Sequence, residues 1–350
     1  MSRAEKRSLS RSIEPEAAVR PPAPKPYRDT LWRRARSFAA SAFFESLAAT
    51  GRLHPAASPR RHGVEVVSDV QYGPDPEFHK LDIYRPVHRP GPWPVVFYVH
   101  GGAFHLLSKD THWLMVLVLA RFGYLVINIS YRLAPKHPYP AAIEDTCRAY
   151  TWLSQRVVEL GGDPNRVAVA GESAGANLIT SLALASSLDR TEPWAKAVQA
   201  TGMVPRAVLP FCGMLEVSRP ERFGQRRRLP KLIDEMIQDA SASYLHGVAP
   251  GQGTELADPL RLLERAADLV AGGGDPAFAR PLPPFFAPVG TRDPLLDDTR
   301  RLEKALATLN VPCEARYYPG GIHAFHALVW EPSARRCWRD ALAFLDRHMR

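Results

Sequence analysis

Residues 171–175 read Gly-Glu-Ser-Ala-Gly, a G-x-S-x-G pentapeptide centred on Ser173. The apolar run at 166–171 predicts a buried strand before the serine, and AGANLITSLALASSL predicts a helix after it. In this strand–turn–helix setting a serine hydroxyl is exposed and can act as a nucleophile. Gly171 and Gly175 leave room beside the strained turn, where a β-carbon would clash. The pattern therefore predicts Ser173 as a nucleophile.

A serine hydroxyl needs an adjacent base to become reactive. In this strand–turn–helix architecture the order along the chain is serine, acid, histidine. VGTRDPLLDD places Asp293 directly after a predicted strand, and YYPGGIHAFHAL places His323 in a glycine-containing loop after the last predicted strand. The carboxyl ends of parallel strands meet at one edge of a sheet, where such folds form their sites. We therefore predict a catalytic triad of Ser173, Asp293 and His323.

Two other carboxylates and one other histidine lie close to these positions in the sequence. Asp297 and Asp298 fall where the next helix is expected to begin, so we expect them to cap that helix. His326 follows His323 closely, and we expect it to pack on the helix that comes next. These residues stay open as alternatives for the acid and the base.

Backbone N–H donors for a developing negative charge are predicted in two loops. The apolar run VVFYVH at 95–100 is followed by Gly101, Gly102 and Ala103. Glycines directly after a strand allow N–H groups to point at an oxyanion. We predict that the N–H groups of Gly102, Ala103 and Ala174 form the oxyanion hole. We expect His100 to order this loop through a hydrogen bond and to transfer no proton.

Strand-like and helical patterns alternate from residue 64 onward and must position these residues. Two short strands, 64–73 and 79–86, predict an antiparallel start, and further strand-like runs follow at 95–100, 124–131, 166–171, 207–214, 284–290 and 314–320. Amphipathic or apolar helical patterns separate most of them. This alternation predicts an α/β fold with a mostly parallel central sheet and helices on both faces.

The remaining segments divide the chain further. Residues 1–30 form a basic tail rich in Pro and Ser, which we expect to be disordered; the first 36 residues hold ten Lys and Arg against four Asp and Glu. Residues 31–62 contain an amphipathic helix that could dock on the body as part of a lid or lie on a membrane surface, and we favour docking. Residues 215–283 interrupt the alternation and predict a cap insertion. The core is then 63–214 and 284–350.

Composition excludes several classes of protein. The chain has 350 residues, 45% of them apolar, and a net charge of +9. This apolar share is too high for a wholly disordered chain. The four cysteines contain no CxxC pair, which argues against a zinc site or a disulfide framework and favours reduced, mostly buried thiols. We see no apolar run of membrane-spanning length, no secretory signal and no aromatic-interleaved basic patch, so we expect a cytoplasmic enzyme without a nucleic-acid partner.

Five segments together resemble the hormone-sensitive-lipase-like group of α/β-hydrolases, the bacterial family IV esterases. They are HGGAF, YRLAPKHPYPAAIED, DPNRVAVAGESAGAN, TRDPLLDD and GIHAFH, in the family's order. The resemblance implies an α/β-hydrolase fold with a helical cap, carboxylic ester hydrolysis, no cofactor and no metal. It supports the triad and the oxyanion hole predicted above, and it suggests a homodimer formed through the last helix and strand.

Departures from the family pattern concern the site. Ala103 stands where the family usually has a third glycine, so a methyl group borders the predicted hole and can restrict bulky substrates. GESAGA replaces the common GDSAGG, and we expect Glu172 and Ala176 to change local packing. Tyr131 and Arg132 of the YRLAP segment are expected to tie the end of a strand to neighbouring loops.

The sequence therefore predicts a carboxylic ester hydrolase that forms an acyl-enzyme and acts on small esters with short to medium acyl chains. One alternative is an amidase or deacetylase with the same triad, since both reactions pass through an oxyanion. Another is an interfacial lipase anchored by the helix that carries Phe38, Phe43 and Phe44. A ligand-binding protein of the same fold is a third, and the presence of His323 argues against it.

Overall fold

The central element is an eight-stranded sheet, seen in a computed structural model that describes residues 30–226, 228–248 and 253–349. The strand order is β1-β2-β4-β3-β5-β6-β7-β8. β1 pairs with β2, and β2 with β4, in antiparallel fashion, and all other neighbours are parallel. The predicted α/β fold with an antiparallel start and a mostly parallel sheet is confirmed.

The eight strands lie where the apolar runs predicted them, with ends that differ by a few residues. Their bounds are β1 Glu65–Gln71, β2 Lys80–Arg85, β3 Trp93–Val99, β4 Leu125–Ile129, β5 Gly162–Glu172, β6 Ala207–Phe211, β7 Phe285–Gly290 and β8 Cys313–Tyr318. Strands β4, β6 and β7 are buried along their whole length, as expected for strands covered on both faces.

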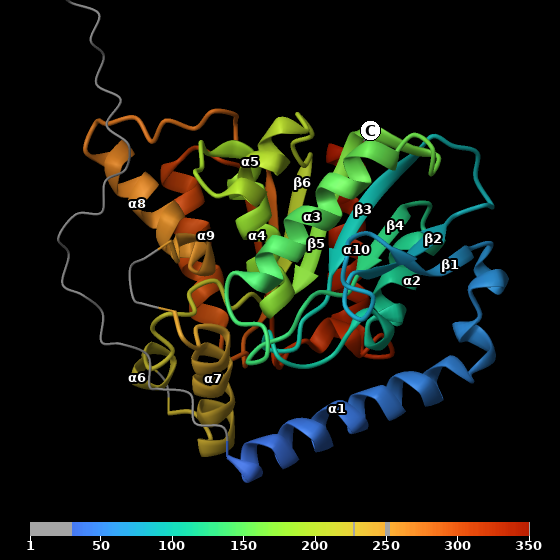
Figure 1. The fold of residues 1–350 in the computed structure, drawn as a ribbon, viewed down its shortest axis with the longest axis horizontal. Helices are drawn as coiled ribbons and strands as arrows, with labels where there is room; N and C mark the ends of the chain where they lie inside the picture. The colour runs from blue at the N-terminus through green and yellow to red at the C-terminus, as the bar shows by residue number, and fades with distance from the viewer. Residues whose placement is uncertain (1–29, 227, 249–252, 350) are drawn as a thin grey trace, which may run out of the picture.

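Helices cover both faces of the sheet (Figure 1). α2 (Trp113–Arg121) and α10 (Pro332–His348) pack on one face, where their apolar residues share a core. α3 (Ala141–Arg156), α4 (Ala174–Ser187), α5 (Pro193–Ala200) and α9 (Leu296–Thr308) share the core on the other face. Alternate residues of β3 divide between these cores: Val95 and Phe97 face one, Val96 and Tyr98 the other. This two-sided packing fixes the strand ends that carry the site.

The insertion between β6 and β7 contains α6 (Arg222–Arg226), α7 (Lys231–Tyr244) and α8 (Pro259–Ala271). No pattern singled out in the sequence predicted α8. Its apolar face joins the same core as α4 and α9, so this helix packs with the body of the protein. In Figure 1, α6 and α7 lie on the side to which the arrow of β5 points, which is the carboxyl edge of the sheet.

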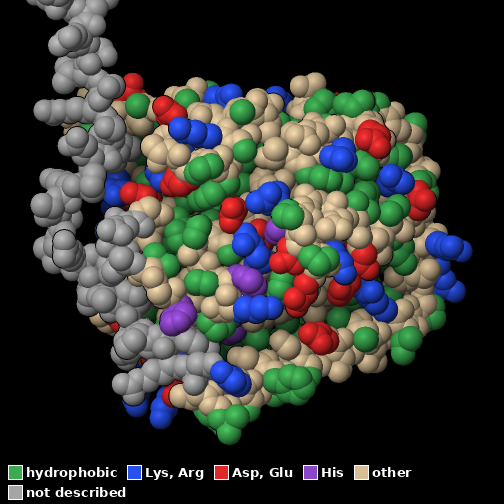
Figure 2. Space-filling model, in the orientation of Figure 1, with side chains coloured by type: hydrophobic (Ala, Val, Ile, Leu, Met, Phe, Trp, Pro, Cys, Tyr) green, Lys and Arg blue, Asp and Glu red, His purple; other side chains and the backbone are tan. Residues whose placement is uncertain are grey.

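The N-terminal helix α1 (Leu31–Arg52) runs along that same side of the molecule (Figure 1). It has no buried residue and contacts the rest of the chain near its two ends. Arg36 pairs with Asp239 of α7, and the Trp113 indole donates to the carbonyl of Ala48 at 3.1 Å. Phe38 is 76% exposed, and Figure 2 shows apolar side chains along the lower edge, where α1 lies in Figure 1. Division of the chain into core and cap stays a prediction.

The predicted tie between a strand end and its loops is confirmed after β4. The Tyr131 hydroxyl donates to the carbonyl of His100 at 3.0 Å, and Arg132 makes paired hydrogen bonds to Asp145. All four cysteines are free, and three of them are buried, as expected. No helix among the described residues is long and apolar enough to cross a membrane.

Candidate active site

Ser173 occupies a sharp turn between β5 and α4. Its backbone has φ +54° and ψ −114°, a conformation that is strained for a residue with a side chain. The turn is held by the end of β6, because the Ser173 N–H donates to the carbonyl of Phe211, the last residue of that strand, at 2.9 Å. A β-carbon on Gly175 would lie 2.1 Å from the Val99 carbonyl oxygen, so only glycine fits there. The sequence prediction of a strained, glycine-dependent turn agrees with this geometry.

The structure brings the three residues of the predicted triad together from three strand ends. His323 Nε2 lies 3.0 Å from Ser173 Oγ. On the other side of the ring, Nδ1 lies 3.1 and 3.0 Å from the two carboxylate oxygens of Asp293. Asp293 is 1% exposed, and its Oδ1 also accepts the N–H of Leu295 at 2.8 Å. The arrangement can pass a proton from the hydroxyl to the imidazole while the carboxylate fixes the ring.

The environment of His323 favours proton acceptance. Burial alone would lower the pKa of its imidazole, but the nearby charge of Asp293 outweighs burial and holds that pKa well above its ordinary value. A ring with a raised pKa is a stronger base towards the serine hydroxyl. It must also be neutral to accept the proton, so activity is expected to require a pH above this pKa.

Asp298 and His326, two of the alternatives for the acid and the base, make other contacts. Asp298 is fully buried and does not cap α9 as predicted; its Oδ2 accepts the N–H groups of Leu215 and Glu216 at 2.8 and 3.2 Å, and its carboxylate pairs with Arg222. The prediction was wrong because a tertiary ion pair recruits the carboxylate. His326 packs on α10 as expected, with its carbonyl accepting from Trp338, and burial lowers the pKa of its ring to about 4.

The loop after β3 carries Gly102 and Ala103, two of the three residues predicted to donate to an oxyanion. Gly102 has φ +114°, and a β-carbon there would lie 2.0 Å from the Leu106 carbonyl oxygen, so the position requires glycine. Ala103 follows with φ +54°. Within the described part of the chain, the N–H groups of Gly102, Ala103 and Ala174 find no acceptor. Unpaired N–H donors of this kind are what the stabilisation of a tetrahedral oxyanion requires, so the predicted assignment of these three residues stays open to test.

His100 lies inside this loop, as expected of a residue that orders it. Its Nδ1 is 2.6 Å from the Gly101 carbonyl oxygen, and its ring stacks on Tyr131 with centroids 4.2 Å apart. Burial lowers the pKa of His100 to about 3, so the ring is neutral at physiological pH. No geometry here links His100 to a proton transfer.

Glu172 contributes more than the packing role that the sequence suggested. The side chain is buried, and its carboxylate accepts the N–H of Gly101 at 2.7 Å, the hydroxyl of Tyr98 and the Nε2–H of His112. Burial raises the pKa of Glu172, but the interactions with His112 and Tyr98 outweigh it and bring the pKa to about 2. An ionised carboxylate therefore anchors the oxyanion loop to the residue before the nucleophile.

His112 is the charged partner of this carboxylate. Burial lowers the pKa of its ring, but Glu172 reverses the shift and the net pKa is raised. The second ring nitrogen, Nδ1, lies 3.1 Å from the Ser108 carbonyl, an acceptor that suits a protonated ring. Sequence reasoning missed His112 because its role depends on a contact with a residue 60 positions away. The one available signal was the acidic residue inside the G-x-S-x-G motif.

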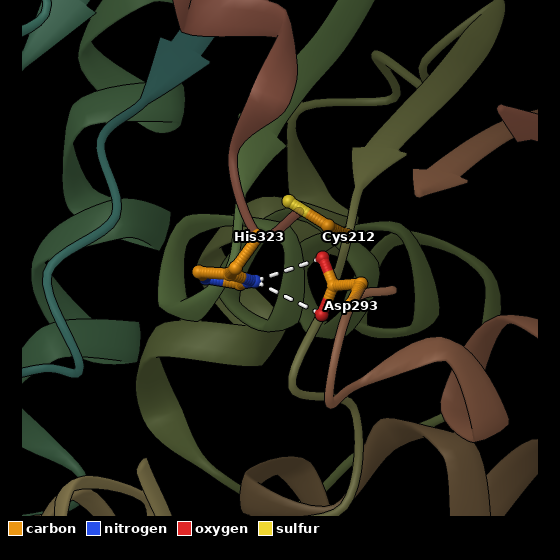
Figure 3. A group of neighbouring side chains, drawn as sticks. All are labelled: Cys212, Asp293 and His323. Carbon is orange, nitrogen blue, oxygen red and sulfur yellow. Dashed lines mark hydrogen bonds and ion pairs between the residues drawn. The ribbon is translucent and has the colours of Figure 1, made fainter. Parts of the chain in front are cut away.

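One set of three described side chains is close enough to hold a metal ion: Cys212, Asp293 and His323 (Figure 3). Cys212 follows β6 and was not singled out in the sequence. Burial raises the pKa of its thiol, so the free side chain is neutral.

Comparison with known proteins identifies the family. Residues 96–327 match a family model described as the α/β-hydrolase fold. The chain is 34% identical over 257 residues to the carboxylesterase NlhH of Mycobacterium tuberculosis, covering 73% of each chain, and 32% identical over 254 residues to an acetyl esterase of Salmonella enteritidis, covering 69% and 68%. A solved bacterial heroin esterase superposes with a TM-score of 0.71 at 25% identity, over 90% of this chain and 93% of that one. The chain therefore belongs to the α/β-hydrolase family, as a hormone-sensitive-lipase-like serine carboxylesterase.

Proposed function

We propose that this carboxylesterase hydrolyses small esters through an acyl-enzyme on Ser173. The observation that carries the proposal is the 3.0 Å contact between Ser173 Oγ and His323 Nε2, with Asp293 on the opposite ring nitrogen. His323 takes the serine proton as Oγ attacks the ester carbonyl, and Asp293 stabilises the imidazolium that forms. The N–H groups of Gly102, Ala103 and Ala174 receive the oxyanion.

Acylation ends when His323 gives its proton to the leaving alcohol, which departs and leaves the acyl group on Ser173. Deacylation repeats these steps with water in place of the serine hydroxyl. Water then enters, gives a proton to His323 and attacks the acyl carbonyl, and the released acid restores the serine hydroxyl. Two observations support short acyl chains as substrates: the methyl group of Ala103 borders the proposed hole, and relatives of this chain are named acetyl esterases.

Hydrolysis of nitrophenyl esters from acetyl to palmitoyl tests the proposal. We expect the highest kcat/KM on short chains and its near-complete loss in Ser173→Ala. Ser154→Ala is a matched control, because the Ser154 hydroxyl donates to the Thr151 carbonyl within α3, a helix that carries none of the proposed catalytic residues. Activity that survives in Ser173→Ala would move the nucleophile elsewhere. Faster cleavage of a matched anilide than of its ester would support an amidase instead.

A second candidate is a lipase that acts at lipid surfaces. The observation that favours it is the exposure of Trp32, Phe38 and Phe43 on α1, which are 73%, 76% and 63% accessible to solvent. Amphipathic helices with exposed aromatic residues bind membrane interfaces. A rise in rate when a triglyceride exceeds its solubility, lost in Phe38→Ser/Phe43→Ser, would establish this candidate. A hyperbolic dependence through the solubility limit would exclude it.

A further inference from the structure

A thiol lies beside the acid and the base, and the mechanism above does not use it. Cys212 comes directly after β6, is fully buried and has φ +39°. Its N–H donates to the Pro288 carbonyl of β7 at 2.9 Å, which fixes the backbone between two neighbouring strands. Cys212, Asp293 and His323 each offer one ligand atom, and these atoms all lie within 4.8 Å of one another (Figure 3). The strand ends of β6, β7 and β8 thus converge on one small volume.

We propose that Cys212, Asp293 and His323 form a binding site for a thiophilic divalent cation, Zn²⁺ or Cd²⁺, and that the bound ion switches the esterase off. The proposal that the ion inhibits the enzyme rests on the proposed function, because Asp293 and His323 are the residues proposed to activate Ser173. The metal site itself stands on the placement of the three ligand atoms.

The three side chains are of the types that bind Zn²⁺, and their ligand atoms lie close enough to reach one ion after a small movement. A tetrahedral Zn²⁺ holds thiolate, imidazole and carboxylate at about 2.0–2.3 Å, which places the ligand atoms roughly 3.3–3.6 Å apart. The present separations of up to 4.8 Å therefore need a contraction of about 1 Å or a little more. His323 Nδ1 and the Asp293 oxygens are already 3.0–3.1 Å apart, so the contraction must bring the Cys212 sulfur closer to this pair. The side chain of His323 is 36% exposed and follows Gly320 and Gly321, which leaves its ring room to turn towards the thiol. This partly exposed side chain also gives an ion access to the two buried ligands.

The charge and the ligand types of the three side chains favour Zn²⁺ or Cd²⁺ over Mg²⁺ and Ca²⁺. A thiolate, a carboxylate and a neutral imidazole carry two negative charges, so a divalent ion makes the buried cluster neutral. Mg²⁺ and Ca²⁺ prefer six or more oxygen ligands, and this cluster offers oxygen from Asp293 alone. Thiolate and imidazole are ligands that Zn²⁺ and Cd²⁺ accept readily. The site should therefore discriminate against the hard cations.

Binding blocks catalysis by changing the protonation of one ring. The two oxygens of Asp293 beside Nδ1 favour the tautomer of neutral His323 with its proton on Nδ1, and Nε2 then faces the serine hydroxyl as an acceptor. The ion takes the place of that proton on Nδ1, and the proton moves to Nε2. The Cys212 thiol releases its own proton to solvent as it becomes a ligand. Nε2 then cannot accept the proton of Ser173, so the serine is no longer activated.

Inhibition is tested with the full chain in a buffer that does not bind metals. We expect ZnCl₂ or CdCl₂ to abolish nitrophenyl acetate hydrolysis and a chelator to restore it, while MgCl₂ has no effect. In Cys212→Ala the half-inhibiting concentration, measured against that variant's own metal-free rate, should rise at least about tenfold. Cys313→Ser, which removes the partly exposed thiol of β8, should retain the wild-type inhibition. Equal inhibition of wild type and Cys212→Ala would overturn the proposal.

Binding is measured separately from activity. In Ser173→Ala all three ligands remain, and calorimetry should show one Zn²⁺ per chain, lost in Ser173→Ala/Cys212→Ala. If the Cys212 variants fail to fold, Cd²⁺ titration of Cys313→Ser decides instead, because a thiolate–Cd²⁺ absorption band should grow in step with the loss of activity. Loss of activity without the band overturns the proposal. A folded wild type that binds Zn²⁺ through Cys212 but hydrolyses no ester refutes the proposed function and leaves the metal site standing.

Discussion

Replacing Glu172 by glutamine tests whether a buried carboxylate holds the oxyanion loop. The carboxylate accepts three hydrogen bonds, from the Gly101 N–H, the Tyr98 hydroxyl and the His112 ring. Glutamine has almost the same shape but carries an amide NH₂ in place of one acceptor oxygen. Whichever way the amide turns, its NH₂ faces at least one of these donors. The substitution therefore breaks the network while hardly changing the packing volume.

The size of the effect follows from the burial of the pair. Removing one partner of a buried ion pair costs about 3–5 kcal/mol when the other charge stays in place. His112 can avoid part of this cost by releasing its proton, which leaves mainly a lost charge-assisted hydrogen bond of about 1.5–3 kcal/mol. We therefore expect Glu172→Gln to lower the free energy of unfolding by about 2–4 kcal/mol. Since Glu172 acts on the oxyanion through Gly101, we expect kcat to fall by roughly 10- to 100-fold, less than direct loss of a donor.

Urea unfolding and steady-state kinetics on nitrophenyl acetate measure the two effects. Glu159→Gln, at an exposed position after α3, controls for the loss of one negative charge. A positioning role predicts that kcat falls while KM changes little, because the oxyanion forms only in the transition state. If Glu172→Gln unfolds like wild type, the carboxylate does not stabilise the site. Lower stability with an unchanged kcat would refute the link between Glu172 and the oxyanion loop.

Three further predictions concern the predicted triad and the loop. Asp293→Asn should lower kcat by roughly 10⁴-fold with little loss of stability, measured by active-site kinetics and thermal unfolding, because the amide favours the wrong imidazole tautomer. The pKa of His323 is raised, so kcat/KM should fall with decreasing pH through a midpoint above the ordinary value of 6.5, seen in a pH–rate profile. Gly102→Ala would place a β-carbon 2.0 Å from the Leu106 carbonyl oxygen, so the loop must move. Its activity should fall by about 100-fold or more while its circular dichroism stays native.

The sequence predicted the sheet and the three strand-end residues for identifiable reasons. Fully buried strands such as β4 and β7 appear as short, largely apolar runs, and their alternation with longer helical patterns indicated strands. Ser173 was recognisable because the elbow depends on local sequence, namely a strand, a glycine-flanked serine and a helix. Asp293 and His323 then followed from chain order and from their places after predicted strands. The structure places all three in contact, and their catalytic roles remain proposals.

Other features depend on contacts that no local pattern reveals. Asp298 has the sequence context of a helix cap, yet the tertiary partner Arg222 takes its carboxylate. The helix α8 was hidden because Gly- and Pro-rich stretches surround it, although its apolar face is regular and buried. His112 has no local signature, since its charge depends on Glu172, and the acidic residue in the G-x-S-x-G motif was the one available signal. In each case a long-range ionic or apolar contact outweighed the local preference.

The placement of Cys212 follows from the same topology that assembles the predicted triad. Strands β6, β7 and β8 are neighbours and parallel, so the residues that follow them meet although they lie far apart in the chain. The residues after β7 and β8 supply the acid and the base in the proposed mechanism. The residue after β6 is fixed beside them by its backbone and has no part in that mechanism. With cysteine at position 212, the side chains at this edge of the sheet can bind a soft cation. With alanine at that position, the thiolate ligand would be missing. Sensitivity to Zn²⁺ should therefore depend on one side chain, while the order of the strands alone determines where that side chain lies.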